Sequence, residues 1–585
     1  MSEFAVWAPR PRRVQLKIRE TLYALNGPDE HGWWRLPVDD TGHGTDYGFV
    51  LDDDATVLPD PRSLWQPNGV HGMSRVYDHS RFEWTDQGWQ PAPLAASIHY
   101  ELHVGAFTPE GTLDSAIGKL DYLAELGVTH IELMPVAEFS GDRGWGYDGV
   151  HLYAVTENYG GPDALKRFIN ACHRRGLAVV LDVVYNHFGP VGNYTERFGP
   201  YLTDRYHTPW GGAINFEGRG GEEVRRFFFD NALMWMRDYH VDGLRLDAIH
   251  EIADRSAVHF LEQLSAETRV LSTTLRRELV LIAESDLNDP RIVRSVETGG
   301  YGISAQWSDD FHHALFTILH REPGGYYSDF GKLEHFAKAM RDVFVYDGHY
   351  SEYRDRRHGR PVDGLSAHHF LVFLQNHDQV GNRAQGERLE QLIGMDRAKV
   401  AAGIVLTAPF VPLLFMGEEF AASTPFLYFA DHDEPEMVRL VSEGRKREFA
   451  AFGFGEKDVP DPEASETFTR SKLNWGETGE GKHSEMLNWY RSLIHLRRTL
   501  PALNDGDRGH MKMNFDEEHC WMDIHRAGLG RGDVRILANL GGDAATFAMS
   551  SSYRIELASQ TGILCGNSAI TLPPNSLAIL SCELV

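Results

Sequence analysis

Four clusters of polar side chains each follow a run of apolar residues that is typical of a buried strand. The clusters are Asp182-Val183-Val184-Tyr185-Asn186-His187, Arg245-Leu246-Asp247, Glu284-Ser285-Asp286 and Gln375-Asn376-His377-Asp378. If these segments meet in space, their carboxyl groups repel one another and lose solvation, so at least one pKa should rise. Because that arrangement opposes folding, it indicates chemistry that uses both an ionised and a protonated carboxyl group.

Cleavage of a glycosidic bond needs such a set. One carboxylate attacks the anomeric carbon, a protonated carboxyl donates to the leaving oxygen, and a third can bind the hydroxyls of the distorted ring. Arg245 lies two residues before Asp247 on the same face of a strand, and its fixed charge would keep Asp247 ionised and nucleophilic. His187 and His377 are suited to hydrogen-bonding sugar hydroxyls.

The clusters end strands within a longer alternation of strands and helices. An apolar helix pattern at 115–126 and a helix opened by Pro162 separate the first strand candidates, which predicts a parallel sheet with right-handed crossovers. Eight candidates are present, as a closed α/β barrel of the (β/α)₈ (TIM) type requires, and the carboxyl ends of all its strands face one cleft. The candidates are 98–104, 129–136, 177–187, 241–247, 279–284, 303–307, 370–378 and 410–417.

The 585 residues are too many for one hydrophobic core, and the pattern divides them into three domains. Residues 1–92 alternate in the manner of short strands and predict an N-terminal β-sandwich. The barrel occupies 93–505, and its Gly- and Pro-rich segment 188–220 predicts an inserted loop or small subdomain on the active face. Residues 506–585 return to alternation and predict a C-terminal β domain.

Composition narrows the partners and the compartment. The chain carries 84 acidic and 57 basic residues, a net charge of -27, which disfavours nucleic acid and anionic membranes and favours a neutral substrate. The first residues have no apolar signal core, and no run of about 18 apolar residues occurs, so we expect a cytoplasmic protein. The four cysteines lack the spacing of a metal site or a disulfide framework.

Each polar residue taken alone also has a structural explanation. Asp247 could be a helix N-cap, and Asp182 could be a buried acid that holds Arg245 rather than a sugar ligand. His187 and His377 could be core histidines, and Trp145 and Tyr147 could pack at the barrel mouth. Four polar clusters at four strand ends are nevertheless hard to explain as separate accidents.

The segments LDVVYNH, GLRLDAIHE, AESDLND and LQNHDQVGNR resemble, in order and position, the four signature segments of the α-amylase superfamily. The resemblance implies that Asp247 is the nucleophile, Glu284 the general acid/base and Asp378 the stabiliser of the transition state. It also implies supporting or sugar-binding roles for a further set of residues: Arg245, His377, Asp182, Asn186, His187, Tyr147 as the aromatic platform under the sugar, and Trp145 beside it.

Finer features resemble one family within that superfamily, the maltooligosyltrehalose trehalohydrolases, from about residue 4 to 580. The resemblance implies hydrolysis of the α-1,4 bond next to the terminal trehalose of a maltooligosyltrehalose, a substrate that a partner synthase makes from α-glucan ends. Recognition of the 1,1-linkage is expected from His250, Glu251, Asp286 or the loop 350–365. The similar segments are FAVWAPRPRRVQL, HTPWGGAINFEG, YYSDFGKLEHFAKAM, RHGRP and PFLYFADHDE.

Many α-amylases bind calcium with the asparagine equivalent to Asn186. Segment 188–220 contains Asp204 and Glu217 but no dense cluster of oxygen ligands, so we predict neither a required metal nor another cofactor. Three alternatives to the trehalohydrolase remain: a glycogen branching enzyme with the same triad, an isoamylase-type debranching enzyme, and a noncatalytic glucan-binding protein. The last would be expected to lack one of the three carboxylates, and all three are present.

Overall fold

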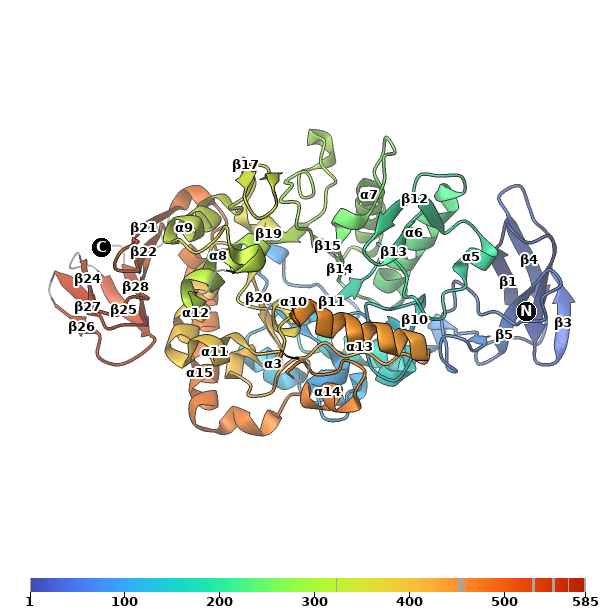
Figure 1. The fold of residues 1–585 in the computed structure, drawn as a ribbon, viewed down its shortest axis with the longest axis horizontal. Helices are drawn as coiled ribbons and strands as arrows, with labels where there is room; N and C mark the ends of the chain where they lie inside the picture. Colours follow the sequence, from blue (N-terminus) through green and yellow to red (C-terminus); the bar gives the residue numbers. More distant parts are fainter. Residues whose placement is uncertain are drawn as a thin grey trace.

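Eight parallel strands close into a barrel at the centre of the molecule (Figure 1). The computed structural model describes residues 2–321, 324–450, 455, 458–528, 532–549, 553–566 and 568–582. All eight predicted strands are present, which confirms the (β/α)₈ fold. They are β7 (His99–Leu102), β8 (His130–Leu133), β11 (Ala178–Val183), β14 (Gly243–Leu246), β15 (Val280–Ala283), β16 (Ala305–Trp307), β19 (Phe370–Phe373) and β20 (Val411–Phe415).

The interior of the barrel is apolar on one side and polar on the other. Val180, Ile282, Leu371 and Val411 belong to the apolar cluster that fills it from β11 round to β20. On the remaining strands, β7 and β8, the register pairs His99 with His130 and Glu101 with Glu132, so polar side chains occupy the inward positions there. Asp182 and Arg245 form a further polar pair near the carboxyl ends of β11 and β14. Buried polar side chains therefore lie inside the barrel next to the polar clusters that follow β11 and β14.

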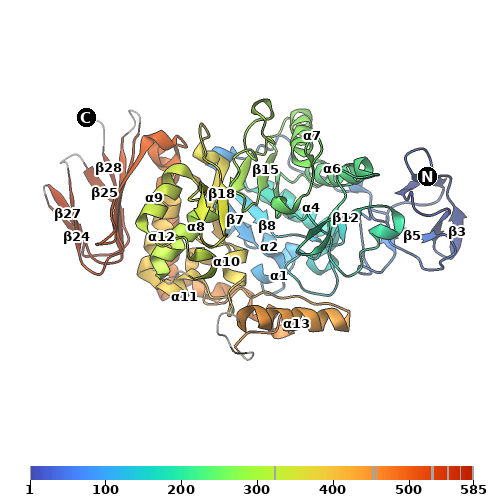
Figure 2. The same cartoon turned by 45° about the horizontal axis from the view of Figure 1, so that its top comes forward.

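Helices cover the outside of the barrel (Figure 2). The predicted helix at 115–126 is instead two helices, α2 (Leu113–Ile117) and α3 (Leu120–Leu126), because Gly118 caps the first. The helix opened by Pro162 is present as predicted. The longer helices are α4 (Gly161–His173), α6 (Gly221–Asp238), α7 (Phe260–Leu275), α8 (Asp309–His320), α12 (Met395–Thr407), α13 (Pro435–Ala450) and α15 (Gly481–Thr499).

Antiparallel sheets lie at the two ends of the molecule (Figure 1). At the N-terminal end, β1 (Ser2–Trp7) pairs with β4 (Trp33–Val38), and a second sheet has the order β3-β2-β5-β6. Its strands are β2 (Val14–Ile18), β3 (Thr21–Ala24), β5 (Asp46–Leu51) and β6 (Ser74–Arg75). Phe4 and Tyr47 join the two sheets through a ring contact of 5.0 Å.

The C-terminal end is built from a five-stranded and a three-stranded sheet. The apolar run at 570–580 contributes to both, because Pro573 and Pro574 separate β27 from β28. We propose domain boundaries at 92/93 and 505/506. The strands are β21 (Met511–Asp516), β22 (Trp521–Arg526), β23 (Val534–Asn539), β24 (Ala545–Ala548), β25 (Tyr553–Ala558), β26 (Leu564–Cys565), β27 (Ala569–Leu572) and β28 (Ser576–Cys582).

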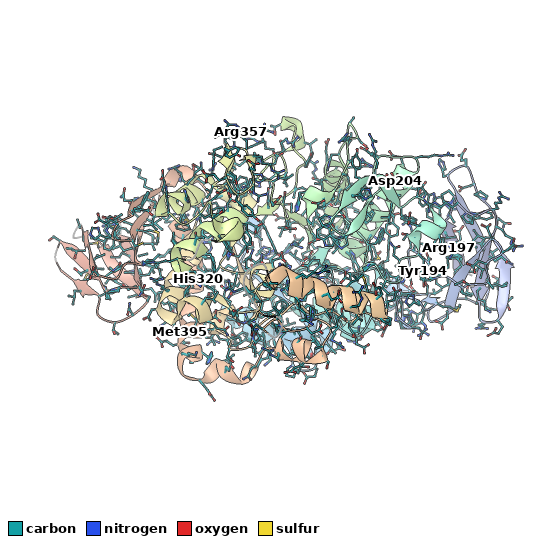
Figure 3. The ribbon with its side chains drawn as sticks, viewed as in Figure 1. Tyr194, Arg197, Asp204, His320, Arg357 and Met395 are labelled. Carbon is teal, nitrogen blue, oxygen red and sulfur yellow. The ribbon has the colours of Figure 1, made fainter. Side chains whose placement is uncertain are left out.

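Three excursions rise from the carboxyl ends of the strands. The segment after β11 contains α5 (Thr195–Phe198) and the hairpin β12 (Leu202–Thr208)–β13 (Gly211–Ile214). A hairpin of β9 (Ala137–Glu138) and β10 (His151–Val155) follows β8, and another of β17 (Asp347–Ser351) and β18 (Arg356–Gly359) precedes β19. Figure 3 shows Asp204 on β12 and Arg357 on β18 well apart along the same edge of the molecule.

The excursion after β11 also contacts the N-terminal sheets, beside which Figure 3 places Tyr194 and Arg197. Arg197 pairs with Asp54 at 2.7 Å between Nη2 and Oδ2, and the Tyr194 hydroxyl lies 2.7 Å from Nδ1 of His71. The N-terminal β region therefore braces the inserted segment. Among the described residues, no helix is both long and apolar enough to span a bilayer.

Candidate active site

Arg245 connects the carboxyl groups of three strands. Its side chain is fully buried, and Nη1 lies 2.7 Å from Oδ2 of Asp182 and 2.8 Å from Oδ1 of Asp247. Nη2 lies 3.6 Å from Oε2 of Glu284. One permanent cation therefore balances three carboxyl groups that the sequence places far apart, and their mutual repulsion is reduced at the point where β11, β14 and β15 end.

Asp247 is held by two partners. Besides the bond from Arg245, it accepts a hydrogen bond from Nδ2 of Asn186 at 2.9 Å to Oδ2, and the same nitrogen donates to its backbone oxygen at 2.8 Å. Ala248, and not Asp247, is the N-cap of the short turn that follows. The alternative that Asp247 is merely a helix cap is therefore wrong, and both of its partners are of the kind that stabilises an ionised carboxylate.

Glu284 occupies a different environment at the end of β15. Burial raises the pKa of Glu284; Arg245 opposes the rise and Asp247 adds to it. Its Oε2 accepts a hydrogen bond of 2.5 Å from the backbone nitrogen of Ala248. Two neighbouring carboxyl groups thus lie in different environments, as acid catalysis requires: Asp247 accepts from a permanent cation and an amide, whereas burial raises the pKa of Glu284.

Asp378 belongs to the short helix α10 (His377–Gly381), which begins directly after β19. The Asn376 side chain accepts from the backbone nitrogens of Asp378 and Gln379 and so fixes the start of this helix. The Asp378 side chain is 41% exposed, the most open of the three predicted catalytic carboxyls. It is therefore placed to meet a sugar in the cleft.

His377 and Tyr147 form one contact between the barrel and the β9–β10 connection. The Tyr147 hydroxyl donates to Oδ2 of Asp182 at 2.7 Å and lies 2.9 Å from Nε2 of His377. The two rings stack with centroids 5.2 Å apart. Nε2 of His377 also lies 3.4 Å from Oδ1 of Asp378, so this histidine is part of the polar cluster rather than an isolated core residue.

The remaining residues of the third-strand segment, Asp182 and His187, are both buried. Burial raises the pKa of Asp182 to about 7 although Arg245 opposes it, and both hydrogen-bonding partners of Asp182 are protein groups. This geometry favours the alternative that Asp182 is a buried acid holding Arg245. His187 bonds to Oδ1 of Asn186 and stacks on Trp210, a ring that is 49% exposed on the β12–β13 turn.

Trp145 does not face open space. Its Nε1 donates to the backbone oxygen of Leu427 at 3.0 Å, and its ring stacks on Phe426 with centroids 5.4 Å apart. The geometry favours the alternative in which Trp145 packs at the barrel mouth, although its edge contact with His377 at 5.4 Å lets it support the site.

A cleft of about 780 Å³ opens beside these groups, along the ends of β15, β16 and β19. Three of the predicted residues line it, namely Glu284, Asp286 and Asp378. Burial opposes the ionisation of Asp286, but the hydrogen bond from Arg354 at 2.9 Å and the charges of His250, Arg354 and His358 together lower the pKa of Asp286. The lining also includes Trp307, Asp309, His313, Phe316, Tyr326, Tyr327, Tyr346, Tyr353, Gln379, Asn382, Arg383, Glu387 and Phe449.

The two predicted residues after Asp247 are less closely connected. His250 lies near enough to Glu284 and Asp286 for its charge to lower the pKa of each. Within the described part of the chain, no hydrogen bond or ion pair joins Glu251 to the three carboxyl groups.

Sequence reasoning missed several polar residues of the site. Asp309 opens α8 and lines the cleft, and burial together with Glu284 and Asp378 raises its pKa well above the ordinary value. The pair Asp309-Asp310, one residue beyond the strand candidate 303–307, was the available signal. Glu101, described below, was missed because a single acid inside the run 98–104 does not reveal which way its side chain faces.

The predicted absence of a metal stays a prediction. In the described ranges, no three His, Cys, Asp or Glu side chains come together as metal ligands. Asn186 directs Nδ2 to Asp247 and Oδ1 to His187, and Glu217 bonds to Arg205 and Tyr206.

Comparisons with known proteins agree with this geometry. A model of the alpha amylase catalytic domain matches residues 75–206. A malto-oligosyltrehalose trehalohydrolase from Rhizobium sp. (strain M-11) is 47% identical, covering 99% of this chain and 97% of its own, and one from Mycobacterium tuberculosis (strain CDC 1551 / Oshkosh) is 46% identical over 99% of each. The chain belongs to the malto-oligosyltrehalose trehalohydrolase family. This membership confirms the resemblance seen in the sequence, and the chain is therefore a glycoside hydrolase.

Two further comparisons bear on fold and on the alternative function. A crystal structure described as a putative alpha amylase from Salmonella typhimurium has a TM-score of 0.91 and 38% identity, and covers 99% of this chain and 97% of its own. A 1,4-alpha-glucan branching enzyme from Bacillus caldolyticus is 30% identical over 77% of this chain and 70% of its own. The trehalohydrolase family is thus much closer to this chain than that branching enzyme.

Proposed function

We propose that the protein is a retaining glycoside hydrolase that cleaves the α-1,4-glucosidic bond next to the terminal trehalose of a maltooligosyltrehalose. The products are trehalose and a maltooligosaccharide. The observation that carries the proposal is the match, at 47% identity over nearly the full length, to a relative named malto-oligosyltrehalose trehalohydrolase. Asp247 and Glu284 beside Arg245, together with Asp378 beside His377, supply the groups that the reaction needs.

In the first step, the Asp247 carboxylate attacks the anomeric carbon while Glu284 donates its proton to the oxygen of the departing trehalose. The C–O bond to trehalose breaks, and a glycosyl ester to Asp247 forms. Water then attacks the same carbon, Glu284 takes its proton, and the ester bond to Asp247 breaks. Two inversions at one carbon leave the product with the original α configuration.

The supporting residues stabilise the charges and the sugar ring during these two reaction steps. Arg245 stabilises the anion of Asp247 before attack and after release, and Asn186 fixes the direction of its Oδ2. Asp378 and His377 bind the hydroxyls of the distorted ring, and Tyr147 lies beneath that ring. For Asp182 we propose a role through Arg245, and for Trp145 a role in packing.

Incubation with maltotriosyltrehalose and, separately, with amylose tests the proposal. Rapid release of trehalose and maltotriose from the first, with little action on amylose, is the expected result. Inert maltotriosyltrehalose together with new α-1,6 branches in amylose would make the protein a branching enzyme. Release of linear chains from an α-1,6-branched glucan would make it a debranching enzyme.

Loss of the Tyr147 hydroxyl should lower activity moderately. A Tyr147→Phe variant keeps the ring that stacks on His377 but removes the hydrogen bond donated to Asp182 and the hydroxyl contact with Nε2 of His377. We therefore expect kcat/KM for maltotriosyltrehalose to fall roughly 10-fold, about the effect of losing one hydrogen bond. Steady-state kinetics with trehalose detection measures the change.

Tyr185→Phe is the matched control, because the buried Tyr185 hydroxyl donates to Oδ1 of Asn231 at 2.6 Å away from the cleft. Both variants should lose comparable stability in thermal unfolding, but only Tyr147→Phe should lose activity. Equal kcat/KM for the two variants would remove Tyr147 from the site.

We further propose that the protein acts in the cytoplasm and that its substrate is supplied by a synthase that converts the reducing end of an α-glucan into a trehalose unit. No disulfide joins the cysteines of the described residues, which suits a reducing compartment. Cell fractionation with an antibody against the chain tests the location.

A further inference from the structure

We propose that Glu101 is a positioning residue that fixes the ring of His377 and, through the start of α10, the carboxylate of Asp378. The proposal rests on the proposed function only for the choice of substrate in one of its tests. Glu101 lies on β7, the first strand of the barrel, whereas His377 follows β19, the seventh. Neither the signature segments nor the mechanism above contains it.

Both oxygens of Glu101 are committed to His377. Oε1 lies 2.5 Å from Nδ1 of the ring, and Oε2 accepts from the backbone nitrogen at 2.9 Å. The Glu101 side chain is 1% exposed and faces the barrel interior, so a sugar in the cleft cannot reach it. With Nδ1 bound in this way, the edge of the imidazole left to face Tyr147 and Asp378 is Nε2, at 2.9 Å and 3.4 Å.

The backbone bond has a second consequence. The first nitrogens of a helix have no partner within the helix, and α10 satisfies them individually. Asn376 accepts from Asp378 and Gln379, and the nitrogen of His377 is left for Glu101. Glu101 therefore attaches α10, the helix that carries Asp378, to β7, which is separated from β19 by β20 in the barrel.

The charges around the ring favour an imidazolium. Burial opposes it, but Asp378 and Glu101 outweigh burial and raise the pKa of His377 to about 9. Arg245, facing it from β14, acts against the charge, and Asp182 on β11 acts in its favour. Glu132 on β8, whose pKa burial raises to about 8, attracts the imidazolium only where it is ionised. His103, beyond the end of β7, interacts unfavourably with the charge. Of these groups, Glu101 is the one bound to Nδ1.

Glu132 provides a matched control in the same layer of the barrel. The register pairs it with Glu101 across β7 and β8, and it is equally buried at 1% exposure. Its oxygens have no hydrogen-bond partner among the described residues, with Nδ1 of His99 nearest at 3.5 Å. Because burial raises the pKa of Glu132 to about 8 and so favours its neutral form, glutamine is a close substitute for this side chain.

The first test is kinetic and compares Glu101→Gln with Glu132→Gln. Glu101→Gln should lower kcat on maltotriosyltrehalose by about 10- to 100-fold, as loss of a carboxylate that orients a histidine does elsewhere, with little change in KM. Glu132→Gln should keep kcat within about 2-fold of the wild type, and Glu101→Asp should recover part of the loss. Equal kcat in Glu101→Gln and wild type, or equal losses in the two glutamine variants, would overturn the proposal.

The second test needs no substrate and so separates this proposal from the proposed function. The proton between Nδ1 of His377 and Glu101 should give a proton NMR resonance far downfield of the amides below pH 9. That resonance should disappear in Glu101→Gln and in His377→Gln and persist in Glu132→Gln. A wild-type spectrum in which His377→Gln removes no downfield resonance would overturn the proposal even if trehalose release is normal.

Discussion

An Asp247→Asn variant is expected to lose at least about 1,000-fold in kcat on maltotriosyltrehalose, because an amide oxygen cannot form the glycosyl ester at a useful rate. The change is nearly isosteric. Arg245 keeps its contacts with Asp182 and Glu284, so the unfolding midpoint should stay within a few degrees of the wild type. Single-turnover measurement of trehalose release quantifies the loss, and thermal unfolding establishes that the fold is kept.

The nucleophile can also be identified by the stereochemistry of rescue. In Asp247→Gly the lost side chain leaves space on the face from which the carboxylate attacks, so added azide should yield the β-linked glycosyl azide. A product of α configuration would mean that another group attacks first. Normal turnover by Asp247→Asn would remove Asp247 from the nucleophile role, whatever the rescue gives.

A Glu284→Gln variant is expected to show a comparable loss that depends on the leaving group. Trehalose needs a proton to depart and fluoride does not, so the loss on maltotriosyltrehalose should exceed the loss in the first step on α-maltosyl fluoride by at least about 10-fold. Burst measurements of fluoride release isolate that first step. An equal loss on both substrates would contradict an acid role for Glu284.

The same residue should control one side of the pH profile. Because burial raises the pKa of Glu284, and because the protonated form is the active one, kcat/KM should fall as pH rises through that pKa. In Glu284→Gln this decline should be absent, since the amide does not titrate in the range. A decline that persists unchanged would assign it to another group.

The contrast between Glu284 and Asp247 shows why the site is arranged around a buried arginine. Arg245 lies closer to Asp247, at 2.8 Å, than to Glu284, at 3.6 Å, and the Coulomb attraction follows that order. Two carboxyl groups on adjacent strands thereby receive different electrostatic environments from one buried arginine.

The sequence alone determined the fold class and was sufficient to predict the principal residues of the site. Strand periodicity and the order of strands and helices were sufficient to predict eight parallel strands. A strand with an apolar period of two, or a helix with a period of 3.6, can bury its apolar face in only a few arrangements. The same topology implied that the polar ends of β11, β14, β15 and β19 face one cleft. The local sequence pattern was sufficient to predict a site residue wherever its side chain lies at the end of its own strand.

The tertiary structure decided the roles that depend on partners from distant strands. Asp182 is bound by Arg245 and Tyr147, Trp145 packs against Phe426, and Glu101 holds His377 across 276 residues of sequence. Asp309 enters the cleft only because β16 ends beside β15. Hydrogen-bond partners, burial and pKa depend on what lies within a few ångströms, and closure of the barrel, rather than local sequence, fixes those neighbours.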